Sequence, residues 1–209
     1  MAEKFIDIDG EALFKVVEAL QHAPKEIRPA IAHAINKTMD STITQVKREV
    51  AAEYTIKQKD VSKAITRKRA TVSKLTGAAI AEGGQVALYK FKHTPVQPPP
   101  KQIYKQQVKA QVKKNGGKKP VKNKAGNKAF VQTVSGNHMI FARVRKSRLP
   151  IEKLFALSVP QMISDKNDSK GSIQRIKART EEMLEKKIEQ EINYRLLKIQ
   201  KEAIKGKGK

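Results

Sequence analysis

Few residues in this 209-residue chain have the type and spacing that catalysis or metal binding requires. The chain contains no Cys, and its four His residues, at positions 22, 33, 93 and 138, lack the spacing of metal ligands. Glu49 and Glu53 stand four residues apart, but no His accompanies them, so a solvated helical face explains them better. No P-loop, HExxH or GxSxG motif is present. The sequence therefore predicts no catalytic residue, no metal site and no cofactor.

Positive charge is the property that does predict a partner. Lys and Arg number 44 against 20 Asp and Glu, which gives a formal net charge of +24. Between Gly83 and Ile151 there is no acidic residue at all, whereas the same stretch holds sixteen Lys or Arg. Nucleic-acid phosphates would supply the missing counter-charge, with release of their counterions as the driving force. The acidic surface of a neighbouring protein would also supply this counter-charge. The alternative without any partner is a solvated segment that keeps the protein soluble.

Lys dominates this acid-free segment, and Lys contacts phosphate as a point charge without reading base edges. We therefore expect contact with a polyanion to be independent of nucleotide sequence. The candidate residues for contact with nucleic acid or a partner are Lys101, Lys105, Lys109, Lys113, Lys114, Lys118, Lys119, Lys122, Lys124, Lys128, Arg143, Arg145, Lys146 and Arg148.

Two long helices are predicted to carry the fold. Apolar residues recur every three or four positions from Ile27 to Val50 and again from Ile173 to Ile199, which predicts amphipathic helices over about 25–52 and 172–203. A shorter helix is expected over 11–22, between Gly10 and Pro24. Asp60 is a candidate N-cap for a short helix that ends at Ile65.

The middle of the chain reads as β-structure. Residues 69–80 and 85–92 predict two strands joined at Gly83-Gly84, residues 104–113 a third, and residues 129–134 and 138–145 a hairpin around Ser135-Gly136-Asn137. The expected fold class is α+β, with the two long helices packed on one antiparallel sheet of four or five strands drawn from residues 68–145. We divide the chain into an N-terminal helix or arm (1–24), a single domain (25–203) with a flexible basic loop (95–128), and a disordered basic tail (204–209).

An apolar block follows the last basic residues of the acid-free segment. Leu149, Ile151, Leu154 and Phe155 come directly after Arg148. Phe155 in particular is expected to fill either the core or a contact between subunits. A plain core role and a role in assembly are both open at this point.

Four stretches carry a family resemblance: AIAHAINKT (30–38), REVAAEYTIKQKDVSKAI (48–65), FVQTVSGNHMIFARV (130–144) and RLPIEKLFALSVPQM (148–162). Their order and content resemble the prophage minor tail protein Z family of lambda-like phages, and more widely the tail-completion and neck proteins. The most specific piece is the RLPI-x-x-LF-x-x-SVP block. Ala156-Leu157 stands in it where such sequences often have Gly-Pro.

The resemblance implies a low-copy structural protein of the virion, at the head-proximal end of the tail. It implies a ring of copies around the DNA channel, with other tail and neck proteins as partners and packaged DNA as a phosphate contact. The alternative is a free, sequence-independent DNA- or RNA-binding protein. A nuclease is disfavoured because two-metal chemistry needs a cluster of carboxylates.

Two further expectations concern location and self-association. The N-terminus lacks the pattern of a signal peptide, and no apolar stretch approaches the ~20 residues of a membrane helix, so synthesis in the host cytoplasm is expected, away from membranes. The resemblance implies the virion, at the head-proximal end of the tail, as the protein's location. A charge of +24 per copy makes free copies repel one another. We therefore expect their association to increase with salt or with an added polyanion.

Overall fold

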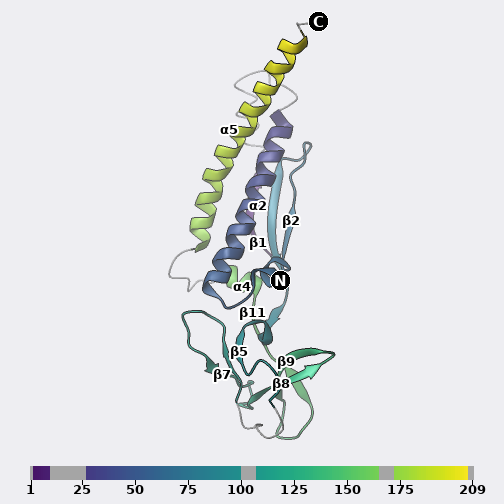
Figure 1. Ribbon diagram of the computed structural model, residues 1–209, viewed down its shortest axis with the longest axis vertical. Helices are drawn as coiled ribbons and strands as arrows, with labels where there is room; N and C mark the ends of the chain where they lie inside the picture. The colour runs from purple at the N-terminus through teal and green to yellow at the C-terminus, as the bar shows by residue number, and fades with distance from the viewer. Residues whose placement is uncertain (1, 10–26, 100–106, 165–171, 207–209) are drawn as a thin grey trace. The chain divides into compact units, whose positions relative to one another are not determined.

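The computed structural model describes residues 2–9, 27–99, 107–164 and 172–206 (Figure 1). The predicted helix over 11–22, the first part of the strand predicted over 104–113, and the candidate residues Lys101 and Lys105 lie outside the described residues. The chain divides into two compact units. We call Ala2–Val46, Ile65–Ala81 and Lys166–Lys209 the helical unit, and Lys47–Ala64 with Glu82–Asp165 the basic unit.

The helical unit contains one sheet and two long helices. The sheet has the order β1-β3-β2, and β2 pairs with β3 in antiparallel register from Ile65↔Ala81 to Lys68↔Ala78. Figure 1 shows α2 between α5 and the strands of this unit. The elements are β1 (Ala2–Asp9), α2 (Ile27–Glu53, whose last seven residues belong to the basic unit), β2 (Ile65–Lys68), β3 (Thr76–Glu82) and α5 (Ser172–Gly206).

Close contact between α2 and β3 depends on a glycine. Ile35 and Met39 of α2 are buried against β3, and a Cβ atom built on Gly77 would lie only 2.9 Å from Cγ2 of Ile35. Ala79 and Ala81, next along the same face of β3, are also buried. Small residues on the strand therefore let the helix approach the sheet closely.

The other side of α2 packs against α5, and the two helices run antiparallel. Thr42 and Thr180 share a hydrogen bond of 3.1 Å between their hydroxyl oxygens, while Lys37 lies at 2.6 Å and His33 Nδ1 at 2.9 Å from Glu191 Oε1. Lys187 donates to the carbonyl oxygen of Lys37. On α5 the buried positions follow a helical stripe of Ile176, Thr180, Leu184, Ile188 and Glu191.

Both long helices are confirmed, but α2 is buried more widely than its sequence indicates. The apolar spacing of α2 predicts one buried face and one solvent-exposed polar face, which includes Lys37 and Asp40. In the structure α5 covers the side that carries Lys37, and Asp40 forms an ion pair with Arg67 of β2. The polar face of α2 is therefore partly covered, and its Lys37 and Asp40 are each in an ion pair. At the other end of the chain, α5 continues to Gly206, so residues 204–206 of the expected tail are helical.

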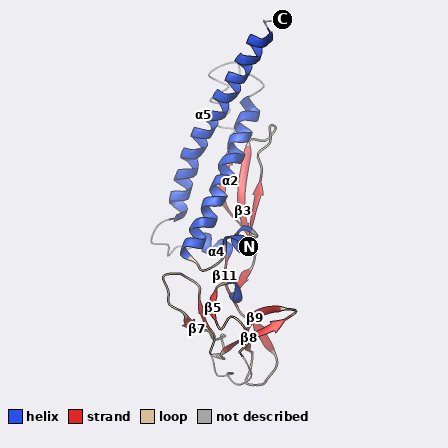
Figure 2. Ribbon diagram, viewed as in Figure 1, coloured by secondary structure: helices blue, strands red, loops and turns tan. Residues whose placement is uncertain are grey.

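The basic unit holds three small antiparallel sheets instead of one large one (Figure 2). Their orders are β10-β9-β8, β11-β4 and β5-β6-β7. The strands are β4 (Gln85–Ala87), β5 (Lys92–Thr94), β6 (Lys109–Gln111), β7 (Lys119–Pro120), β8 (Ala129–Val134), β9 (Asn137–Arg143), β10 (Ile151–Lys153) and β11 (Phe155–Ser158).

The α+β class is therefore confirmed, whereas the single sheet of four or five strands is wrong. β3 and β4 flank Gly83-Gly84 as expected but do not form a hairpin, because β3 pairs with β1 and β2 while β4 pairs with β11. The predicted hairpin of β8 and β9 is confirmed, with Ser135 and Gly136 at positive φ in its turn. Such two-residue turns match the twist of the strands they join.

Short helices complete the basic unit. They are α3 (Gln58–Ser62), the 3-10 turn η1 (Leu88–Lys90) and α4 (Val159–Ile163). Lys57, not Asp60, precedes α3, and the Asp60 carboxylate instead forms an ion pair with Lys90 at 2.9 Å. Ser158 and Gln161 form a capping box on α4, in which each side chain bonds the other residue's backbone N–H.

We predict that filling the space at Gly77 destabilises the helical unit. Gly77→Val places methyl groups where Ile35 already lies, and such overpacking costs about 1–3 kcal/mol of the free energy of unfolding. Urea denaturation of the purified chain measures the change. Gly84→Val is the control, because no atom lies within 4 Å of a Cβ at that position. Equal stability of the two variants would contradict close packing of α2 on β3.

We also predict an acid-dependent contribution from Glu191. Burial raises the pKa of this carboxyl, but hydrogen bonds from Lys37 and His33 and their charges outweigh burial, so its pKa is lowered. A carboxyl whose pKa is lowered in the folded state stabilises the fold above its ordinary pKa, and this stability is lost as the pH falls through the lowered value. Glu191→Gln should cost about 1.5–3 kcal/mol near neutral pH, towards the lower end because Lys37 and His33 are half exposed.

The measurement for Glu191 is urea unfolding of both proteins at a series of pH values. The difference between wild type and Glu191→Gln should shrink below the ordinary carboxyl pKa of 4.5, as Glu191 becomes protonated. Glu182→Gln is the matched control on the same helix, because Glu182 is exposed and pairs with Lys186 of α5 itself, with no ion pair to α2 in the described residues. A pH-independent difference would show that the Glu191 charge is not what stabilises the helix pair.

Candidate nucleic-acid interface

The acid-free segment folds into β-structure and is not one flexible loop. Val121 N–H donates to the Val108 carbonyl at 2.8 Å, and Ala129 N–H donates to the Val121 carbonyl at 3.1 Å. The loop expected over 95–128 thus includes strands β6 and β7, and an isolated antiparallel bridge joins Lys122 to Lys128. Many backbone groups of its described residues 107–128 are hydrogen-bonded within the protein, so the Lys side chains there project from β-structure.

Two asparagines fasten the most basic turn of this frame. Within the turn, Asn127 N–H donates to Oδ1 of Asn123 at 2.7 Å, and Gly126 takes a positive φ of 82°. Both side-chain amides also donate to the carbonyl oxygen of Arg143, at 2.9 and 2.8 Å. Asn123 additionally donates to Oε1 of Glu152 at 2.9 Å. These bonds hold residues 122–128 against the ends of β9 and β10.

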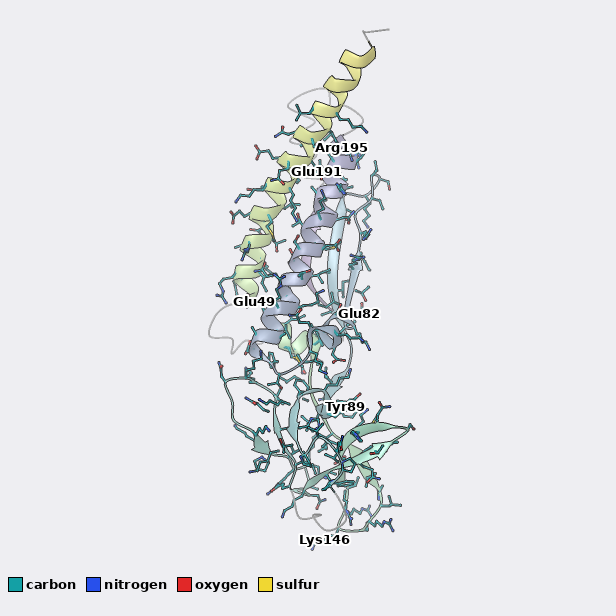
Figure 3. All side chains as sticks on the ribbon, viewed as in Figure 1. Glu49, Glu82, Tyr89, Lys146, Glu191 and Arg195 are labelled. Atoms are coloured by element: carbon teal, nitrogen blue, oxygen red, sulfur yellow. The ribbon has the colours of Figure 1, made fainter. Side chains whose placement is uncertain are left out.

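The hairpin between β9 and β10 adds a second basic feature next to this turn. Ile151 pairs with Arg143, and Val144 N–H donates to the Pro150 carbonyl at 3.0 Å, so residues 145–149 form the tip. Figure 3 labels Lys146 at this tip. Arg143, Arg145, Lys146 and Arg148 are all exposed.

We call the exposed basic residues of the Asn-fastened turn and of the adjacent hairpin the basic patch. Its members are Lys122, Lys124, Lys128, Arg143, Arg145, Lys146 and Arg148. Within the part of the chain that the structure describes, none of them takes part in an ion pair. Seven exposed cations at one end of β9 and β10 outnumber the nearby Glu152 carboxylate and therefore attract anions.

Other predicted contact residues lie elsewhere in the basic unit. Lys109, Lys114 and Lys119 are exposed, on or beside β6 and β7. Lys118 donates to the Thr94 hydroxyl. Lys113 is held back from solvent, because it pairs with Glu53 at 3.2 Å and lies 5.5 Å from the centre of the Tyr54 ring.

Sequence patterns did not reveal a further basic hollow in the same unit. It has a volume of about 420 Å³ and is lined by Lys47, Gln58, Lys59, Ser62 and Lys63. The spacing of four between Lys59 and Lys63 is the only signal in the sequence. Lys47 comes from α2, so the fold is needed to bring the three lysines together.

The apolar block is less buried than a core role requires. Leu149 is 67% exposed at the hairpin tip, and Phe155 is 49% exposed on β11. Ile151 and Leu154 are half-buried. Within the described residues, Leu149 and Phe155 are therefore too exposed to be plain core residues. A role of the block in assembly stays a prediction.

Phe155 instead forms part of an aromatic surface with a lysine between two rings. Lys153 Nζ lies 5.6 Å from the centre of the Phe155 ring and 5.5 Å from that of Tyr89 (labelled in Figure 3). Each contact is a cation–π interaction, which is worth about 0.5–1 kcal/mol at an exposed site. The buried side of the unit contains Tyr54, Phe91, Val108, Ile140 and Val159 instead.

Within the described residues, no three His, Asp or Glu side chains come together in a way that could hold a metal ion. None of the described helices combines the length and apolar character needed to cross a membrane. The candidate site is the basic patch, and the interaction it offers is electrostatic attraction of anions.

Comparison with known families identifies the chain. The family model of prophage minor tail protein Z (GPZ) matches residues 12–201 of this chain, which is nearly its whole length. The chain belongs to this family. No curated protein and no solved structure matches it.

Membership of the minor tail protein Z family confirms the resemblance seen in the four sequence stretches. It makes the chain a structural protein of a phage tail, located in the virion and in contact with other tail proteins. A structural family also favours a role without catalysis. The match includes both long helices up to residue 201 and the entire acid-free segment.

We predict that Phe155 contributes less to the stability of this minor tail protein than a buried aromatic residue does. Phe155→Ala should lower the free energy of unfolding by about 1–2 kcal/mol, because about half of the residue is already in water and one cation–π contact with Lys153 is lost. Tyr54→Ala is the contrasting variant and should cost about 3–5 kcal/mol, since Tyr54 is fully buried. Thermal unfolding of both measures this. If Phe155→Ala also fails to join tails, its role is in assembly, whereas a large loss of stability would restore the core role.

Proposed function

We propose that this minor tail protein works at the head-proximal end of the tail, where copies form a ring around the DNA channel and the basic patch faces DNA. The observation that supports DNA as the partner is the patch itself. Seven cations without a described ion-pair partner lie within a stretch of nearly seventy residues that holds no acid. A lining of a DNA passage needs this kind of surface, because it must attract phosphates without preferring any sequence.

Rigid placement of the lysines matters for such a role. The Asn123 and Asn127 amides fix the turn on β9 and β10, so the cations lose little conformational freedom beyond their own side chains when phosphates arrive. Two acids of the unit are paired within it, Asp60 with Lys90 and Glu53 with Lys113, and Glu152 Oε1 accepts a hydrogen bond from Asn123. Among the described residues none of the seven cations of the patch is in an ion pair, so the patch keeps its charge for an external anion.

The rival partner is an acidic surface on a neighbouring tail protein. It would meet the same cations and would also explain their crowding. The two hypotheses differ in the DNA affinity that they predict for the free protein. A surface that is complementary to one acidic protein is expected to bind duplex DNA only weakly. The test therefore measures DNA binding and tail incorporation on the same variant.

We predict that the basic patch controls the salt dependence of DNA binding. The variant replaces Lys122, Lys124 and Lys128 by Gln. Each lost phosphate contact should flatten the slope of log affinity against log salt by about 0.9, so the slope should change by roughly three. Mixed-sequence and single-sequence duplexes should bind alike. The matched control replaces the exposed Lys57, Lys74 and Lys177, which removes the same charge elsewhere.

Tail incorporation is the second measurement. Tails that lack this chain are incubated with each variant and examined by immunolabelling and electron microscopy, where label at the head-proximal end supports the proposed location. A flattened slope with label retained supports contact with DNA. Weak DNA binding by wild type, together with loss of label for the triple variant, would overturn DNA in favour of an acidic protein partner. An unchanged slope and unchanged label would contradict both and leave a solubilising role.

A further inference from the structure

We propose that copies of this chain join through the sheet of the helical unit, with β1 of one copy adding to the β2 edge of the next. This inference rests on the proposed ring and specifies the surface by which its subunits meet. Three observations support it: both outer strands of the sheet have an open edge, the outward backbone groups of β2 are unpaired, and the two edges carry opposite charge.

The open edges follow from the strand order. β3 is central in the order β1-β3-β2, so β1 and β2 each have one neighbour in the described part of the chain. β2 is well exposed, with Thr66, Arg67 and Lys68 all facing solvent. An edge strand presents a row of unpaired N–H and C=O groups and is therefore a template for another strand.

The register shows which backbone groups of β2 are available. Glu82 N–H donates to the Ala64 carbonyl at 2.8 Å, so Ala64 points its backbone groups towards β3. In an antiparallel ladder this direction alternates along the strand. Thr66 and Lys68 therefore bond to β3, while the N–H and C=O of Ile65 and Arg67 point to the open edge.

The charges of the two edges are complementary. The sequence of β1, AEKFIDID, holds three acids and one Lys. β2 and the residue after it hold Arg67, Lys68 and Arg69 and no acid. Opposite charges on adjoining strands stabilise pairing, whereas like charges oppose it. An acidic edge and a basic edge on the same sheet thus suit a second copy of this chain.

Arg67 is the one member of this basic edge that is already engaged. Its guanidinium pairs with Asp40 of α2 within the same unit. Lys68 and Arg69 are exposed, and in the described residues neither has an ion-pair partner. Lys68 and Arg69 are successive residues and point to opposite faces of the strand, so together they offer one cation on each face to the acids of a neighbouring β1.

The two edges are different surfaces, so the contact between copies is head-to-tail. Such a contact repeats from copy to copy and closes into a ring when the rotation between neighbours allows it. Charged edge strands more often prevent pairing than promote it. That protection works through like-charge repulsion, which is absent when the approaching edge has the opposite sign.

A charge exchange tests this contact. The first variant carries Lys68→Glu and Arg69→Glu, so both edges are acidic. The second carries Glu3→Lys and Asp7→Lys, so both edges are basic. A third chain carries all four substitutions and has exchanged edges. Each protein is added to tails that lack this chain, and pelleting with cross-linking measures incorporation and links between copies.

The expected pattern is specific to edge pairing. The first and second variants alone should each be incorporated about tenfold less than wild type, since cross-strand charge pairs worth up to about 1 kcal/mol each become repulsive. An equal mixture of the two should restore incorporation, because each acidic edge then meets a basic one. The chain with exchanged edges should also be incorporated and cross-linked.

Net charge provides an internal control. The first variant lowers the formal charge from +24 by four, because two positive residues become negative, and the second variant raises it by four. If general repulsion between copies controlled association, the first variant would therefore be incorporated better than wild type and the second worse. Edge pairing predicts a loss for both. Circular dichroism on each chain checks that it remains folded.

The outcomes separate this inference from the proposed function. Folded variants that are incorporated and cross-linked like wild type would overturn edge pairing and leave the ring in place. Failure of both the mixture and the exchanged chain would overturn it as well. Wild type that joins tails but gives no links between copies would overturn the ring itself. The salt slope for DNA should stay unchanged in all three variants, because none alters the basic patch.

Discussion

The close packing of α2 on β3 is the constraint on which the helical unit depends. Gly77 leaves room for Ile35, and the small side chains of the alanines that follow it on β3 let α2 lie close to the sheet. The opposite side of the same helix is covered by α5, through the Thr42–Thr180 contact and the cluster around Glu191. A helix buried on two sides fixes the position of everything packed on it. The sheet edges are therefore held in place by the interior and can differ freely in charge.

The basic unit meets a different physical problem, which is to fold while carrying many like charges. It does so by bonding its backbone internally and by leaving most cations at the surface, where water and salt screen their repulsion. Asparagine amides, which carry no charge, fasten the basic turn to β9 and β10. Asp60 and Glu53 pair with Lys90 and Lys113, which are not members of the basic patch. A stable fold and an unneutralised surface are thus compatible, as a structural protein of a phage tail in contact with a polyanion would need.

Much of this architecture was predictable, because it follows from local patterns. Apolar spacing predicted α2 and α5, since a stripe at intervals of three and four buries one helix face. The Ser135-Gly136-Asn137 turn predicted the β8–β9 hairpin, and the absence of acids predicted where the positive surface lies. Partner choice between strands was not predictable in this way. β3 and β4 are separated only by Gly83-Gly84, yet they belong to different sheets, and β1 was missed although its acids and apolar residues alternate.

The sequence by itself determined the class of fold, the two long helices and the charge, because each depends on composition or on neighbours within a few turns. Four of its stretches also carry the resemblance to the minor tail protein Z family, which the family model confirms. The tertiary structure decided which charges remain available. Lys113 was among the predicted contact residues, but it pairs with Glu53 from a distant segment. Phe155 was open between a core role and a subunit contact, and about half of it is exposed. Burial and pairing depend on contacts between segments far apart in the chain, and no local pattern records which segments will meet.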